Sequence, residues 1–391
     1  MHAIRVGSQF LFSILLCACT SSLAPSTSEQ PSATVSSIIP PSAASTALID
    51  QLPKGAAPEA GATEPGGQGE GAQNAINPLT GEVVDDALLL QRRPMLIKVS
   101  NFPRNNRPQW GLSRADIVFE HYAEGGLTRF SALFYGQDAE IVGPIRSARF
   151  IDIALVNMYA AVFTYGSADF RVRERIAESA FADRTVTEYP ARCPPMCRFD
   201  PVNYNHLITS TIDVQTYILS RGVDNTPPDL SGLVFSSEAP GKDEAGEALE
   251  IRYADSNFHR WEYAAERGAY LRSQESGADD EEVVPLTDAL DGEQIGAENV
   301  IVVIVAHTFL SGTSGLVEIH LDGAGRALAF RDGYVYEVDW QRDLSGGLRF
   351  SERDGEPYTL KPGSTWIEFV STSSAIHGTE AGEWGIRFHI P

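Results

Sequence analysis

The sequence predicts an α+β protein in which an N-terminal α/β module precedes a β-rich C-terminal module. Residues 79–224 mix helical and strand patterns, whereas residues 232–370 contain short apolar strands separated by regularly spaced turn signals. Between them lies Asn225-Thr-Pro-Pro-Asp-Leu-Ser-Gly232, whose prolines and glycine indicate a domain boundary. About 300 residues follow the N-terminal region, which is enough for two packed modules.

The N-terminus has the pattern of a lipoprotein signal peptide. A basic start containing Arg5 precedes the apolar segment Val6 to Leu16, which is too short for a stable membrane span. The segment ends in Leu16-Cys17-Ala18-Cys19, the residue order of a bacterial lipobox. We therefore expect residues 1–18 to be removed and Cys19 to be lipidated, anchoring the protein to the extracytoplasmic side of a bacterial membrane. The alternative is an ordinary secretory signal, with Cys19 a plain thiol.

Residues 19–78 read as a disordered stalk. They are rich in Ser, Pro, Ala and Gly, lack aromatic residues, and show no sustained helical or strand period. Such a segment buries too little apolar surface to offset the entropy of ordering. We expect it to hold the folded part away from the membrane.

Within residues 79–224 the patterns predict strands joined by helices. Paired glycines in Ala123-Glu-Gly-Gly126 predict a tight turn between the second and third strands, and Ser147 is placed to cap a helix that runs to about Ala160. The expected strands are Met95–Asn101, Asp116–Tyr122, Leu127–Tyr135 and Ala161–Tyr165, and the further helices are Phe170–Ala180 and Ile208–Ser220.

Beyond residue 232 we expect mainly strands. Asp322-Gly-Ala-Gly325 and Asp332-Gly333 have the composition of hairpin turns, and residues 371–391 form a tail for which the sequence predicts no structure. The expected strands are Leu249–Tyr253, His259–Tyr263, Ala269–Arg272, Val300–Ala306, Leu316–Leu321, Ala327–Phe330, Tyr334–Trp340 and Thr365–Val370.

Cysteine usage predicts one local disulfide. After loss of the signal and lipidation of Cys19, only Cys193 and Cys197 remain, in Cys-Pro-Pro-Met-Cys. Outside the cytosol a disulfide is the favoured interpretation. A zinc site is the weaker alternative because only His206 lies nearby. We expect no metal and no cofactor.

Charge and motifs limit the classes of function. The net charge of −22 disfavours nucleic acid as a partner, because an acidic protein is repelled by phosphate backbones. No nucleophile elbow, zinc-protease, phosphate-loop or dinucleotide-binding motif occurs, so catalytic residues stay unassigned.

Residues 107–149 form a segment of balanced charge in this acidic chain, with five Arg and five acidic residues. Guanidinium groups bind carboxylate or phosphate through paired hydrogen bonds, and a helix beginning near Arg146 would add free backbone N–H groups. The alternative is a salt-bridged scaffold. The candidate ligand-binding residues are Arg107, Glu120, Glu124, Arg129, Arg146, Ser147 and Arg149.

Two further classes of function stay open. A hydrolase of wall glycan or peptide would use Glu120 with Glu124 or Asp116, which share one face of a regular strand. A non-catalytic adapter for a protein partner would instead expose an apolar patch.

Several long motifs resemble the YerB-like lipoprotein family, a domain of unknown function numbered 3048. They are Asn77-Pro-Leu-Thr-Gly81, Arg107-Pro-Gln-Trp-Gly-Leu112, Glu124-Gly-Gly-Leu-Thr-Arg-Phe130, Gly143-Pro-Ile-Arg-Ser-Ala-Arg149 and Lys361-Pro-Gly-Ser-Thr-Trp-Ile367. The resemblance runs from about Asn77 to Val370 and implies a layered sandwich of sheets and helices. It implies no reaction. We expect a binding protein rather than an enzyme, with an anionic ligand such as a cell-wall fragment.

Overall fold

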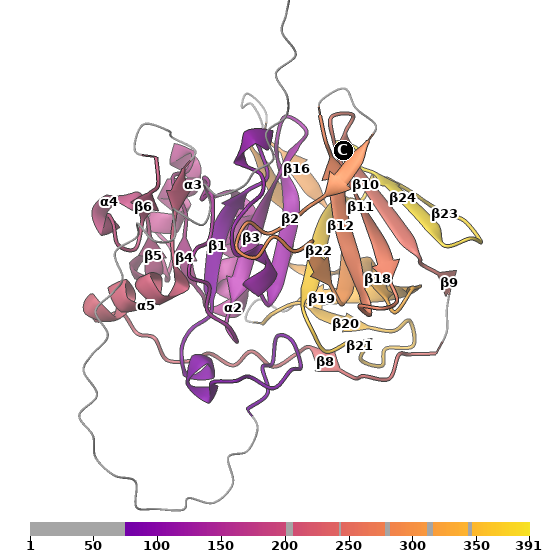
Figure 1. Ribbon diagram of the computed structural model, residues 1–391, viewed down its shortest axis with the longest axis horizontal. Helices are drawn as coiled ribbons and strands as arrows, with labels where there is room; N and C mark the ends of the chain where they lie inside the picture. Colours follow the sequence, from indigo (N-terminus) through magenta and orange to yellow (C-terminus); the bar gives the residue numbers. More distant parts are fainter. Residues whose placement is uncertain (1–74, 201–205, 242–243, 278–281, 311–315, 343–345) are drawn as a thin grey trace, which may run out of the picture. The chain divides into compact units, whose positions relative to one another are not determined.

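The computed structural model describes residues 75–200, 206–241, 244–277, 282–310, 316–342 and 346–391 (Figure 1). The chain divides into the compact units Met1–Ala62 and Thr63–Pro391, and every described residue belongs to the second. Cys19 and nearly all of the expected stalk therefore lie outside the described residues. Among the described residues, no helix is long and apolar enough to cross a membrane.

The folded part begins slightly before residue 79. Ile76 pairs with Val83 in a β-bridge, and Asn77 is buried with its side-chain amide donating to Asp116. The stalk boundary expected at residue 78 is thus too late, because a polar contact with a distant residue holds Asn77 in place.

The fold is mixed α+β. The helical elements are η1 (Ala87–Gln91), η2 (Arg104–Asn106), η3 (Leu112–Arg114), α2 (Phe150–Tyr159), α3 (Phe170–Ala177), η4 (Ala182–Arg184), α4 (Glu188–Ala191) and α5 (Thr211–Ser220). The strands up to residue 264 are β1 (Met95–Ser100), β2 (Ile117–Glu124), β3 (Leu127–Phe134), β4 (Val162–Thr164), β5 (Thr185–Val186), β6 (Cys197–Arg198), β7 (Leu207–Ile208), β8 (Val234–Phe235), β9 (Glu244–Ala245), β10 (Ala248–Ala254) and β11 (Asn257–Ala264).

The remaining strands are β12 (Ala269–Glu275), β13 (Val283–Pro285), β14 (Gly296–Ala297), β15 (Asn299–Val305), β16 (His307–Phe309), β17 (Val317–Ile319), β18 (Gly323–Arg331), β19 (Tyr334–Arg342), β20 (Arg349–Ser351), β21 (Thr359–Leu360), β22 (Thr365–Ser371), β23 (Ala375–Gly378) and β24 (Glu383–Arg387). The strand-rich second half is as the sequence predicts. The tail contributes β23 and β24, and β24 pairs in parallel with β10.

One large sheet joins the two halves of the sequence. Its described strands run in the order β20-β19-β18-β15-β22-β2-β3-β1-β4-β5, with β9 beside β19. Strand β22 pairs in parallel with β15 on one side and with β2 on the other. Figure 1 shows β22 beside β2, although almost 250 residues separate them in sequence.

A second sheet covers one face of the first. Its described order is β13-β12-β11-β10-β24-β23, with β14 beside β12. Apolar side chains from both sheets meet in the core, where Trp261 of β11 and Trp366 of β22 pack edge to face with ring centroids 5.2 Å apart. Helix α2 supplies Asp152 to the opposite face of β1 and β3.

Two local predictions are wrong. Helix α2 is not capped by Ser147: its N-cap is Arg149, because residues 145–148 continue as extended chain and bridge Val99 and Ala168. Asp322–Gly325 is not a turn, since Gly323 and Gly325 lie in β18. The turn at Asp332-Gly333 is confirmed, with positive φ at both residues.

Candidate functional site

The candidate residues fall on two faces of the large sheet. Successive side chains of a strand point to opposite faces. Lys98, Arg129 and Ser131 therefore share the face covered by α2, whereas Glu120 and Thr128 face the second sheet. The sequence grouped these residues by proximity along the chain, and the pleat of the sheet separates them.

A register shift moves Glu124 away from Glu120. The pairing of β2 with β3 is irregular between Tyr122 and Glu124, as at a β-bulge. As a result, Glu124 contacts Arg129 and Arg149 instead of the groups around Glu120. The expectation that positions 116, 120 and 124 share one face is therefore wrong at position 124, and Asp116 bonds to backbone N–H groups of Tyr135 and Gly136.

Lys98 occupies the centre of the face below α2. Its ammonium group donates to the Ser131 hydroxyl and the Asp152 carboxylate, both at 2.8 Å, and contacts the His121 ring. All four side chains are fully buried. Burial lowers the pKa of Lys98 to about 8, with Arg129 and Arg149 adding to the effect against the attraction of Asp152.

Arg129 and Arg149 lie close enough to Lys98 for their charges to lower its pKa, and the charge of Arg146 acts on Arg129. Together with Lys98 these three arginines form what we call the cationic cluster. Burial, and next the charge of Arg149, lower the pKa of Arg129 to about 9, so that it is still charged at neutral pH. Among the described residues in contact with Lys98, Arg129 and Arg149, the carboxylates are those of Asp152 and Glu124.

The sequence predicted free backbone N–H groups near Arg146, but α2 begins after its N-cap residue Arg149. The carboxylate of Asp152 accepts the Arg149 backbone N–H at 2.6 Å, which closes the first turn of α2. The negative charge of Asp152 thus lies at the positive end of α2 and accepts the N–H of its N-cap residue.

Glu124 is clamped by the guanidinium groups of the cationic cluster. Its Oε1 lies 2.8 Å from Arg129 and its Oε2 lies 2.6 Å from Arg149. The Glu124 side chain is 40% exposed, against 13% and 7% for the two arginines. Two nearly buried guanidinium groups thus bind a carboxylate that is partly exposed at the surface.

Arg146 and Ser147 line a neighbouring hollow of about 120 Å³, together with Ser167, Glu188 and Arg198. Arg146 donates to the Ser100 hydroxyl and the Phe102 carbonyl, each at 3.2 Å. The Ser147 hydroxyl is 2.9 Å from that of Ser167, and its carbonyl accepts from Arg129 at 2.9 Å.

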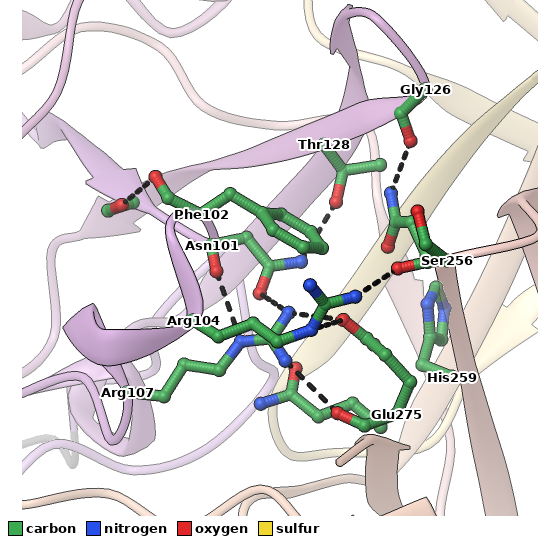
Figure 2. A network of polar contacts seen from close by, with 12 residues as sticks. Asn101, Phe102, Arg104, Arg107, Gly126, Thr128, Ser256, His259 and Glu275 are labelled. Carbon is green, nitrogen blue, oxygen red and sulfur yellow. Dashed lines mark hydrogen bonds and ion pairs between the residues drawn. The ribbon is translucent and has the colours of Figure 1, made fainter. Parts of the chain in front are cut away.

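Arg107 belongs to a different set of contacts, which crosses between the two sheets (Figure 2). Its guanidinium donates to the Asn101 carbonyl and side chain, both at 3.0 Å, and to the Glu275 carboxylate at 2.9 Å. Figure 2 shows Arg104 reaching the same carboxylate and the backbone carbonyl of Ser256. Arg104, Arg107 and Glu275 line a hollow of about 260 Å³.

Glu120 lies deeper in this inter-sheet network, which we define as Asn101, Arg107, Glu120, His259, Arg272, Glu275 and Glu368. The Glu120 carboxylate accepts from Arg272 at 2.7 Å and from Thr128 at 2.7 Å. His259 contacts Glu368 at 2.8 Å. Burial raises the pKa of Glu368 to about 7 and lowers the pKa of His259 to about 3, the latter with help from Arg272.

Glu120, His259 and Glu368 bring potential metal-ligand atoms within 4.8 Å of one another. Arg272 already supplies a positive charge to Glu120, and one nitrogen of His259 is taken by Glu368. The contacts therefore favour charge balance without a metal ion: the Arg272 guanidinium neutralises Glu120, and a bound proton neutralises Glu368. Sequence reasoning missed Arg272, His259 and Glu368, because they come from separate strands.

Lys98 and Asp152 were also missed. Lys98 does carry a signal in the sequence, because it is a lysine within the apolar strand Met95–Ser100 of a chain that contains few lysines. A charge in a buried strand needs a partner.

Cys193 and Cys197 are joined by a disulfide, with Cα atoms 4.5 Å apart. The second cysteine begins β6, which pairs with β7. The bridge lies in the segment before α5, apart from the contacts of the cationic cluster described above.

The fold and its two polar centres define a two-part α+β protein in which separate sequence regions share one sheet. The family model described as "Protein of unknown function (DUF3048) N-terminal domain" matches residues 79–211, and the corresponding C-terminal domain matches residues 249–367. The chain belongs to this family.

The similarity to YerB of Bacillus subtilis, in sequence and in structure, agrees with this assignment. The chain is 27% identical over 304 residues to a protein of strain 168 named "Putative lipoprotein YerB", covering 75% of this chain and 85% of that protein. It is also similar to the crystal structure of YerB from Bacillus subtilis, with a TM-score of 0.64 and 26% identity, over 76% of this chain and 96% of the other.

Proposed function

We propose that this protein is a lipid-anchored binding protein of the bacterial envelope, on the extracytoplasmic side, which holds an anionic or carboxylate-bearing ligand at the cationic cluster. The lipobox ending in Cys19 supports the anchor, as does the similarity to a protein whose name includes the word lipoprotein. A cell-wall fragment with a free carboxylate is the kind of ligand that this location would offer.

One observation carries the proposal. In a chain of net charge −22, Lys98, Arg129 and Arg149 form ion pairs with two carboxylates among the described residues, and one of these, Glu124, lies at the surface. Nearly buried guanidinium groups are poorly screened by solvent, so their attraction for an anion is stronger than that of exposed arginines.

The two alternatives have less support. A hydrolase that uses Glu120 and Glu124 would need both carboxylates at one substrate, but Glu120 is buried against Arg272 and Glu124 is held by Arg129 and Arg149. For an adapter, several apolar side chains such as Phe170 and Tyr189 are exposed, but no partner is indicated.

Thermal unfolding of the full chain carrying Cys19→Ser, which prevents lipidation, tests the proposal. The probes are acetate, inorganic phosphate and wall fragments with free carboxylates, at constant ionic strength. A ligand at a hundredfold its Kd stabilises a protein by ~2.7 kcal/mol, which raises the Tm by roughly 2–4 °C at this size.

Arg146→Ala combined with Arg149→Ala should abolish that shift. The control is Arg326→Ala with Arg353→Ala, which likewise removes two positive charges, because these exposed arginines bind Glu337 and lie outside the cluster. If no probe raises the Tm and the first double variant is merely less stable, the cluster is a scaffold and the proposal fails.

A further inference from the structure

Glu124 occupies the cationic cluster as a bound ligand would. One of its carboxylate oxygens meets Arg129 and the other meets Arg149, at 2.8 and 2.6 Å. Charge-assisted contacts of this length are the strong class of hydrogen bond, and each of the two guanidinium groups takes one oxygen of the carboxylate. The same geometry is available to the carboxylate of another molecule.

The two arginines are fixed independently of Glu124. Arg129 donates to the Ser147 carbonyl at 2.9 Å, and Arg149 donates to the Ala148 carbonyl at 3.0 Å. Both guanidinium groups therefore keep backbone partners when Glu124 leaves. A binding site whose donors are held in place loses little entropy when a ligand arrives.

Glu124, in contrast, lies at the end of a strand next to a glycine pair. Gly125 and Gly126 have φ values of 57° and 81°, and a side chain at Gly125 would meet no atom within 4 Å. Glycine adopts these and many other backbone conformations freely. The register shifts after Tyr122, and Glu124 pairs with Leu127 as the last pair of the ladder before the turn.

We propose that Glu124 is a built-in competitor for the cationic cluster, and that the ligand is a carboxylate that displaces it from Arg129 and Arg149. This inference rests on the proposed function. With Glu124 withdrawn, Lys98, Arg129 and Arg149 face Asp152 as their remaining described carboxylate contact, so an incoming anion restores the balance that Glu124 provides.

The turn that carries Glu124 also contacts the second sheet. The side chain of Asn257, at the start of β11, donates to the Gly126 carbonyl at 2.8 Å, and Figure 2 shows this contact at Gly126. The Gly126 N–H donates to the Tyr122 hydroxyl at 3.0 Å. These two contacts hold the turn at Gly126, so the movement that the proposal requires is that of the Glu124 side chain.

The test compares wild type with Glu124→Gln, in the full chain carrying Cys19→Ser. Binding of acetate and of inorganic phosphate is measured from the ligand dependence of the Tm at constant ionic strength, with acetamide as the uncharged probe. Glu124→Gln should tighten acetate binding by at least about tenfold. In the wild type the Glu124 carboxylate must leave the two arginines before acetate can bind, which lowers the apparent affinity. Acetamide should not bind either protein.

Glu337→Gln is the matched control. Glu337 also bridges two arginines, Arg326 and Arg353, and is 49% exposed, but it lies on β19 outside the cluster. Its substitution should leave acetate binding unchanged. Glu124→Asp, which keeps the charge but is one methylene shorter, should bind acetate with intermediate affinity, and it replaces Glu124→Gln if the latter does not fold.

The outcomes separate the two proposals. If neither wild type nor Glu124→Gln binds acetate or phosphate, the proposed function itself fails. If wild type binds acetate and Glu124→Gln binds it equally or more weakly, Glu124 is no competitor. If Glu124→Gln gains affinity for phosphate but not for acetate, competition stands and the carboxylate class is wrong.

Discussion

Glu120 and Glu368 lie directly opposite each other on the parallel strands β2 and β22, and both side chains are fully buried. Arg272 donates to Glu120, whereas Glu368 contacts His259 and accepts from the Tyr253 hydroxyl. Burial raises the pKa of Glu368 to about 7, against the attraction of Arg272, so Glu368 keeps its proton in the folded protein up to about that pH.

The first prediction concerns Glu368→Gln. An unfolded glutamate has a pKa of 4.5, and burial raises that of Glu368 to about 7. The folded protein thus holds the extra proton, and the stabilisation is fully present below pH 4.5 and is lost as the pH rises through 7. Urea unfolding between pH 4.5 and 8 should show a flatter pH dependence for the variant.

The control for this prediction is Glu262→Gln, because Glu262 is 59% exposed. It should follow the wild-type curve. Parallel curves for wild type and Glu368→Gln would show that Glu368 ionises normally.

The second prediction concerns His259, whose effect has the opposite sign. Burial lowers the pKa of His259 from 6.5 to about 3, so the unfolded chain takes up a proton that the folded chain refuses. Stability is therefore lost as the pH falls from 6.5 towards 3. His259→Gln should reduce this acid loss, measured by urea unfolding at pH 4 and pH 7. An unchanged loss would contradict the assignment of a neutral His259.

The third prediction concerns Lys98. Lys98→Met removes the cation that contacts Asp152 in a fully buried site, and the carboxylate left behind should cost about 3–5 kcal/mol of unfolding free energy. The double variant Lys98→Met with Asp152→Asn should recover part of this loss, as measured by urea unfolding. A cost below about 1 kcal/mol for the single variant would mean that Asp152 finds other partners.

The fourth prediction is that Arg107 contributes to stability and not to ligand binding. Arg107 and Arg104 both contact Glu275, but Arg107 is the more buried and also holds Asn101. Arg107→Ala should lower stability by about 2–4 kcal/mol, and Arg104→Ala by less. Neither should change the Tm shift given by acetate. Loss of that shift in Arg107→Ala would bring Arg107 back into the binding site.

The fifth prediction concerns the anchor. Cells expressing the protein and fed a fatty-acid analogue should incorporate label into wild type and not into Cys19→Ser. The physical reason is that stable attachment to a membrane needs more than one acyl chain, which the lipobox cysteine would provide. Equal labelling of both proteins would place the acyl group elsewhere.

Local patterns were sufficient for most strands of the second half and for the hairpin of β2 and β3. Alternating apolar residues and the glycine pair at 125 and 126 are local signals, and the structure has these elements where they were expected. The start of α2 was misplaced because Ser147 is a good cap by type. The helix begins later, after Arg149, because the preceding chain is extended and Ile145 pairs with Val99 of β1.

The sequence predicted several residues of the candidate site, but not how they are arranged in space. Arg129, Arg149 and Glu124 do meet, as their shared segment suggested. Arg107 and Glu120, from the same segment, instead face the second sheet and pair with Glu275 and Arg272. A register shift of one residue in β2 is not visible in the residue types, and it decides which face Glu124 joins.

By itself, the sequence determined the α+β class, the lipobox, the family motifs and the segment that carries the arginines, because each of these is written in neighbouring residues. Only the tertiary structure decided that β22 lies beside β2 and that Glu368, His259 and Arg272 surround Glu120. Pairing between strands almost 250 residues apart depends on the packing of the whole core, and no local pattern records it.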